Sequence, residues 1–143
     1  MQYKPKYFTL KELVNPKIFA MTADYVLWQL FDPRLLKAAD YIREKYGVCF
    51  VNTSDGVLTD CGLRAVDSPT GAKYSAHKYG RALDLHIKSI EDKKLSKAEK
   101  IKAYDNVRLE LLADKELGFL NYENGISWLH VDSYNRAQRT FKP

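Results

Sequence analysis

The chain has 143 residues, a formal net charge of +5, and a hydrophobic content of 45%. This length suits one domain with a sizeable core, and the composition excludes a disordered or low-complexity polypeptide. No apolar run approaches the roughly 20 residues of a membrane span, and the amino end, MQYKPKYFTLKEL, lacks the apolar core of a secretory signal. We therefore expect one domain that is synthesised in the cytoplasm without membrane insertion, and the positive charge favours an anionic partner.

Residues 1–47 are expected to form helices that act as a scaffold. Thr9 can cap a short first helix, and an apolar segment follows it. Asp32 can cap a longer helix with Pro33 in its first position. Apolar residues then recur at helical spacing until Gly47 ends the pattern. These helices look like core structure rather than a binding site.

The catalytic core is expected over about residues 48–135, where the strand signals lie. Residues 48–52 are β-branched and aromatic, which is typical of a buried strand, and residues 82–87 alternate in polarity. Two further strands, 119–123 and 126–133, are joined through an Asn-Gly pair, which is a strong hairpin signal. We expect these strands to form one sheet.

A long irregular segment and one more helix lie between these strands. Residues 53–71 are rich in Ser, Asp, Gly and Thr, with a short ordered piece expected near residues 61–65. A loop of this length in a small domain is more often functional than idle. Ser96 and Glu99 make a capping box for a helix that runs to about residue 113. The whole pattern predicts a mixed α+β domain.

The two cysteines, Cys49 and Cys61, are too few for a disulfide scaffold or a four-sulfur zinc site. A disulfide bond between these two cysteines across a hairpin is an alternative that the sequence leaves open. Because the secretory signal is missing, we expect reduced thiols that pack in the interior.

The three histidines of the chain stand in or near predicted strands. His77 and His86 flank Asp84 in the segment SAHKYGRALDLHI, and His130 lies in the last predicted strand. A catalytic zinc site commonly takes imidazole and carboxylate ligands from three residues and leaves a fourth position to water. His77, Asp84 and His130 can form such a set, because Gly80 lets the chain turn between the first two. His86 shares a strand face with Asp84, so it can support the site, replace a ligand, or simply pack.

The pattern Ser-x-His-x-x-Gly-x-Ala-x-Asp is complete in residues 75–84, and an aromatic-x-His motif follows at residues 128–130. Over about residues 48–134 the chain resembles the zinc D-alanyl-D-alanine carboxypeptidase family. That family includes phage endolysin peptidases and shares its fold with the Hedgehog signalling domain. The resemblance implies a Hedgehog/DD-peptidase-like fold, in which flanking helices cover a small, mostly antiparallel sheet.

The resemblance also implies roles for individual residues. It places Zn²⁺ at His77, Asp84 and His130, and it makes Arg64, in the Gly-x-Arg turn at residues 62–64, a substrate contact. A guanidinium suits that task because it offers a fixed fork to a carboxylate or to a carbonyl that gathers charge. Zinc lowers the pKa of a bound water and polarises a carbonyl, so the resemblance implies peptide hydrolysis.

The general base of such a peptidase is not obvious in this sequence. Many relatives carry Glu or Asp three residues before the last histidine, where this chain has Ser127, and a serine hydroxyl cannot act as that base near neutral pH. Asp132 shares a strand face with His130, but it can equally orient that ligand. Glu123 resembles an acidic residue that the Hedgehog branch carries upstream of its last zinc histidine. The choice among Glu123, Asp132 and neither stays open.

We therefore expect residues 1–143 to form a monomeric zinc peptidase that hydrolyses peptidoglycan stem peptides or cross-links, as a carboxypeptidase or an endopeptidase. An enzyme without a signal would reach the bacterial cell wall after release, as a phage lysin does, and its charge would aid adsorption. One alternative is a catalytically silent zinc module that binds a peptide or glycan, which Ser127 favours. Another is a basic nucleic-acid binder, whereas the peptidase hypothesis involves no nucleic acid.

Overall fold

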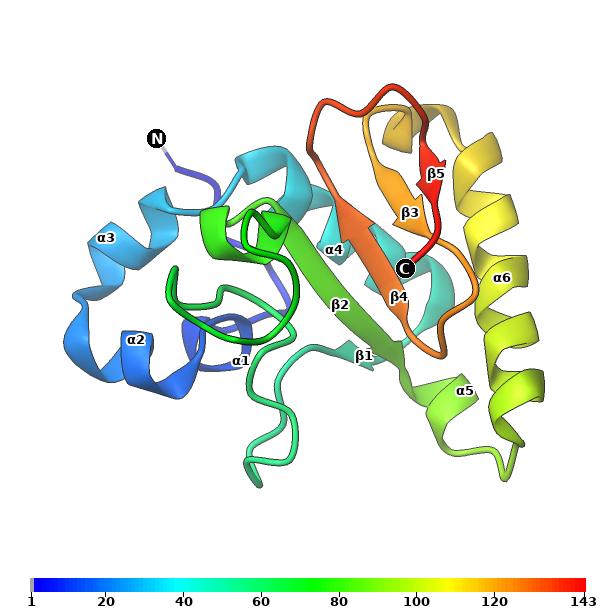
Figure 1. Cartoon of the computed structure of the whole chain (residues 1–143), viewed down its shortest axis with the longest axis horizontal. Helices are drawn as coiled ribbons and strands as arrows, with labels where there is room; N and C mark the ends of the chain where they lie inside the picture. Colours follow the sequence, from blue (N-terminus) through cyan, green and yellow to red (C-terminus); the bar gives the residue numbers. More distant parts are fainter. Residues whose placement is uncertain (1) are drawn as a thin grey trace.

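The computed structural model describes residues 2–143 (Figure 1). Within this range there are six α-helices: α1 (Leu10–Leu13), α2 (Pro16–Met21), α3 (Asp24–Gln29), α4 (Pro33–Tyr46), α5 (Lys88–Glu91) and α6 (Lys97–Ala113). Two 3₁₀ helices accompany them: η1 (Ala76–Tyr79) and η2 (Lys115–Leu117). The strands of the same range are β1 (Cys49–Phe50), β2 (Ala82–Ile87), β3 (Asn121–Glu123), β4 (Leu129–Asp132) and β5 (Thr140–Phe141). The predicted mixed α+β class is confirmed.

The strands form one open five-stranded sheet in the order β1-β2-β4-β3-β5. Its neighbours pair antiparallel, except that β5 runs parallel to β3. Helices α1 to α3 gather on one side of this sheet and α6 lies on the other (Figure 1). The long strands β2 and β4 therefore lie in the middle of the molecule. None of the helices in residues 2–143 has the length and apolarity needed to cross a membrane.

The helix ends follow the predicted capping signals closely. The Asp32 side chain accepts a hydrogen bond from the Arg34 N–H at the start of α4, and Gly47, with φ of +83°, ends the same helix. At the start of α6 the Ser96 and Glu99 side chains each accept from the other residue's backbone N–H. These contacts are local in sequence, which explains why the sequence predicted them.

The strands fit the predictions less evenly. Strand β2 covers the predicted residues 82–87, whereas β1, β3 and β4 are shorter than expected. The Asn-Gly pair belongs to a connection over residues 124–128 instead of a tight two-residue turn. The fully buried Arg108 of α6 explains this difference, because its guanidinium donates to the carbonyls of Ile126 and Trp128. Those carbonyls face α6 and are not available to extend the hairpin.

The long segment over residues 53–71 is anchored to the N-terminal helices. The Leu63 N–H donates to the Leu13 carbonyl, and the Asn15 N–H donates to the Leu63 carbonyl. Gly62 lies so close to this contact that a Cβ there would collide with the Leu13 carbonyl oxygen. The N-terminal helices therefore hold the part of this segment that leads to the candidate site.

Candidate metal centre

Three buried side chains from three elements converge at the centre of the sheet. His77 comes from η1, Asp84 from β2 and His130 from β4, and one ligand atom from each lies within 4.8 Å of the other two. Oδ1 of Asp84 is 3.2 Å from Nε2 of His77 and 2.7 Å from Nδ1 of His130. The two ring nitrogens are 3.3 Å apart. The structure thus brings together the three residues predicted as ligands.

Strand register and one glycine produce this convergence. In the antiparallel pair of β2 and β4, Asp84 lies directly opposite His130. Gly80 ends η1 with φ of +63°, and a Cβ at this position would collide with the Leu30 carbonyl oxygen. Only glycine fits such a turn without strain. The turn carries His77 from η1 back over the first residues of β2.

Hydrogen bonds outside the cluster set the tautomers of both histidines. Nδ1 of His77 lies 2.9 Å from the Gly62 carbonyl, which can only accept, so this nitrogen carries the proton. Nε2 of His130 faces Oδ2 of Asp132 at 3.3 Å. The nitrogens that face the cluster, Nε2 of His77 and Nδ1 of His130, are therefore the ones that a metal ion can bind once they are unprotonated.

The three donor atoms fit a tetrahedral metal ion such as Zn²⁺. Two ligand atoms at about 2 Å from such an ion are separated by about 3.3 Å. The three separations in the cluster, 2.7, 3.2 and 3.3 Å, are close to this value. Two imidazole nitrogens and one carboxylate also match the donor set of catalytic zinc sites, which keep a fourth position open.

The pKa values show how strongly the cluster attracts positive charge. Burial by itself would lower the pKa of His130, but hydrogen bonds to Asp132 and Asp84 outweigh it and raise this pKa to about 9. Burial would raise the pKa of Asp84, yet the adjacent His77 and His130 hold it well below the usual range. The cluster is thus a buried carboxylate with two imidazoles around it, which a divalent cation can neutralise.

A cavity of about 560 Å³ opens onto the cluster, and Arg64 and Glu123 line it. The Arg64 guanidinium is buried, donates from Nε to the Asp60 carbonyl at 2.5 Å, and places its NH2 3.3 Å from Oδ2 of Asp84. Oε2 of Glu123 lies 4.0 Å from Nδ1 of His130, which is the nitrogen that faces the cluster. Both predicted side chains therefore lie beside the candidate metal position.

Asp132 occupies a different place. It is fully buried behind the His130 ring, where Arg136 donates to its two oxygens and Asn121 donates to Oδ1 at 2.9 Å. Burial would raise the pKa of Asp132, but His130, Arg136 and Asn121 lower it to about 2. An ionised carboxylate with this set of partners holds an imidazole in place and is a poor proton acceptor.

His86 lies outside the cluster and packs against neighbouring side chains. Its ring stacks on Phe50 with centroids 5.2 Å apart, and its Nε2 is 3.7 Å from Sγ of Cys61. Its Nδ1 is 3.7 Å from Oε1 of Glu91. Burial lowers the pKa of His86, although Glu91 acts in the opposite direction.

Cys49 and Cys61 are both buried free cysteines.

Two residues near the carboxyl end were not predicted to belong to the site. The Phe141 and His130 rings are nearly perpendicular with centroids 5.7 Å apart, and the Arg136 guanidinium lies 4.0 Å from the centroid of the Phe141 ring. Strand β5 brings Phe141 there by pairing parallel with β3. No local sequence pattern predicts this pairing, because it depends on a contact between segments that are distant in the chain.

Comparison of the chain with protein-family models, with curated proteins and with solved structures gave no match.

Proposed function

We propose that the protein is a zinc peptidase that hydrolyses peptidoglycan stem peptides or their cross-links. The observation that carries this proposal is the convergence of His77, Asp84 and His130 beside a cavity that also holds Glu123 and Arg64. The spacing of these residues along the chain resembles that of the zinc D-alanyl-D-alanine carboxypeptidase family. The Hedgehog/DD-peptidase fold of that family is part of the same proposal.

The residues around the candidate metal position have defined tasks in this mechanism. Zn²⁺ held by the three ligands would supply a water of lowered pKa and a polarising charge for the scissile carbonyl. Glu123 takes the proton from the attacking water and passes it to the leaving amine, because its carboxylate is on the ligand-facing side of His130. Arg64 donates to the oxygen that gathers negative charge. Asp132 keeps the His130 ring in the orientation that ligation requires.

Glu123 thus takes the role that an acidic residue at the place of Ser127 has in many members of the family that the chain resembles. Ser127 lies in the connection between β3 and β4, whereas Glu123 is the last residue of β3 and lines the cavity. A base can come from either position as long as its carboxylate reaches the same water. The positive net charge supports the substrate class, since bacterial wall polymers are anionic.

The decisive experiment combines metal analysis with product analysis. Purified protein is loaded with Zn²⁺, its metal content is measured by mass spectrometry, and purified peptidoglycan is digested and its muropeptides are identified. We expect about one zinc per chain and new stem-peptide termini, with both lost in His77→Ala. Bound zinc without any cleaved bond would reject the peptidase in favour of a silent binding module. Wild-type protein that takes up no zinc would reject both.

A further inference from the structure

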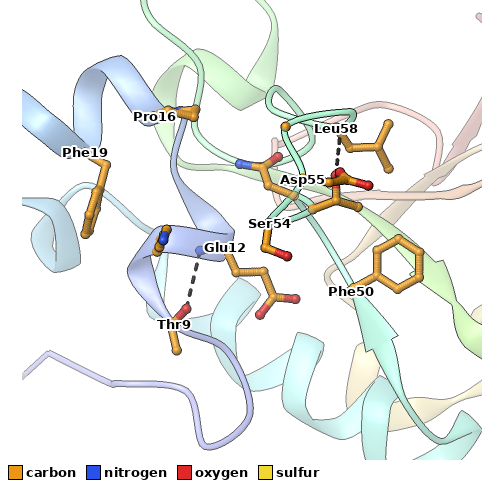
Figure 2. A pocket seen from close by; sticks show the side chains of 12 residues that line it. Thr9, Glu12, Pro16, Phe19, Phe50, Ser54, Asp55 and Leu58 are labelled. Carbon is orange, nitrogen blue, oxygen red and sulfur yellow. Dashed lines mark hydrogen bonds between the residues drawn. The ribbon is translucent and has the colours of Figure 1, made fainter.

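A second cavity, of about 780 Å³, lies between the N-terminal helices and the segment after β1 (Figure 2). It shares no lining residue with the cavity of the metal centre. One wall comes from α1 and the start of α2, and the other from residues 50–58. Its lining is largely apolar or uncharged, with Phe19, Phe50, Pro16 and Leu58 among its members.

Glu12 places a carboxylate in this apolar setting. Its Oε1 accepts a hydrogen bond from the Val51 N–H at 3.2 Å, and Figure 2 shows the side chain extending from α1 toward Phe50. Burial raises the pKa of Glu12 above the usual value for a glutamate. The carboxylate is therefore partly removed from water, and the backbone N–H groups of Val51 and Thr9 lower its pKa only in part.

Glu12 has no counter-ion within 4.0 Å among the residues that the structure describes. The charge of Arg43 lowers the pKa of Glu12 without a direct ion pair, and the Arg43 guanidinium donates to the Cys49 carbonyl at 2.8 Å and lies over the Tyr7 and Phe8 rings. Lys11 also lines the cavity, and its side chain is exposed. A half-buried carboxylate without a directly paired cation favours a ligand that brings one.

The aromatic walls favour the same kind of ligand. The Phe50 ring is held in place by its stacking on His86 at 5.2 Å, so it offers a fixed face to the cavity. An aromatic face attracts a cation and also packs against an aliphatic chain. Asp55, the other acidic residue of the lining, accepts hydrogen bonds from Thr53 and Val57 of its own loop. Because Asp55 is exposed whereas Glu12 is half-buried, Glu12 is the carboxylate whose charge is less screened by water.

We infer that this cavity binds a protonated primary amine with an apolar body, with the ammonium at Glu12 and the body against Phe50, Leu58 and Phe19. The same chemistry occurs in a free alkylamine and in a lysine-type side chain of a peptide. This inference rests on the second cavity alone and does not depend on the peptidase proposal.

The test is a titration of ¹⁵N-labelled protein with n-hexylamine and with its neutral counterpart n-hexanol. Hexylamine is expected to shift the amide signals of residue 12 and residues 50–58, and to bind at least about tenfold more tightly than hexanol. Glu12→Gln is expected to remove this preference, because glutamine can still accept from Val51 but carries no charge. Asp55→Asn is the matched control, and its preference should stay within about twofold of the wild type.

A second pair of probes identifies the source of the amine. Nα-acetyl-lysine methylamide is compared with the same compound acetylated at Nε. Binding of the first but not the second, together with hexylamine binding, supports the inference and indicates a peptide side chain. Binding of hexylamine alone supports it and indicates a small amine. Equal binding of hexylamine and hexanol, an unchanged preference in Glu12→Gln, or shifts confined to the surroundings of residues 77, 84 and 130 would overturn it.

Discussion

Oδ2 of Asp132 lies 3.3 Å from Nε2 of His130, while Nδ1 of the same ring is 2.7 Å from Asp84. The imidazole thus bridges two carboxylates, one on the ligand side and one behind it. Arg136 and Asn121 hold the rear carboxylate in turn. Asp132 thus lies behind the imidazole, whereas Oε2 of Glu123, the other acidic residue considered as a base, is 4.0 Å from Nδ1 on the ligand side.

Asp132→Asn is expected to weaken zinc binding by about ten- to a hundredfold, because the amide no longer provides the charge that orients His130. The affinity can be measured by competition with a chromophoric chelator, and circular dichroism checks that the variant is folded. Glu123→Gln is the control, since its side chain faces the cavity and is expected to change the zinc affinity by less than about threefold. Equal affinities of wild type and Asp132→Asn would contradict the positioning role.

Glu123→Gln is expected to lower turnover of muropeptides by about a hundred- to ten-thousandfold, with zinc occupancy unchanged. The glutamine keeps the shape of the side chain but cannot accept a proton from the attacking water. Initial rates of product release, measured on zinc-saturated protein, provide the comparison. If Glu123→Gln kept full activity, the base would have to be sought elsewhere in the cavity.

Gly80→Ala is expected to lower the free energy of unfolding by more than about 2 kcal/mol. It combines a left-handed backbone, which costs an alanine about 1 to 2 kcal/mol, with a collision against the Leu30 carbonyl oxygen. Gly125→Ala is the control, because Gly125 has φ of +77° but no heavy atom lies within 4 Å of the position that a Cβ would take there. Urea denaturation of both variants measures the difference. Similar losses would show that the close approach at Gly80 is relaxed at little cost.

The stability of the protein is expected to fall at alkaline pH partly because of Cys49. Burial raises the pKa of this thiol to about 12, from an unfolded value near 8.5 to 9. The unfolded chain therefore loses the thiol proton first, so the contribution is complete below about pH 8.5 and is lost as the pH rises toward 12. Its slope is at most about 1.4 kcal/mol per pH unit.

Urea denaturation of wild type and Cys49→Ala at pH 7.5, 9 and 10 isolates this contribution from that of other groups. The stability advantage of the wild type over the variant should shrink across the series, because alanine has no proton to lose. A constant difference would show that the Cys49 thiol ionises as readily in the folded protein as in the unfolded chain.

The sequence by itself determined the features that depend on neighbours along the chain. The caps at Asp32 and Ser96 and the alternation that marks β2 act over a few residues, so they were readable without a structure. The motif in residues 75–84 likewise indicated two of the three candidate ligands, and the aromatic-x-His motif indicated the third.

Only the tertiary structure decided how distant segments meet. The turn at residues 124–128 is shaped by Arg108 of α6, and Phe141 reaches His130 through a parallel pairing that no local pattern encodes. The sequence also could not predict that Glu123 and Asp132 lie on different sides of the His130 ring. Strand alternation gives the face on which a side chain lies, but the direction of a carboxylate depends on partners brought from elsewhere in the fold.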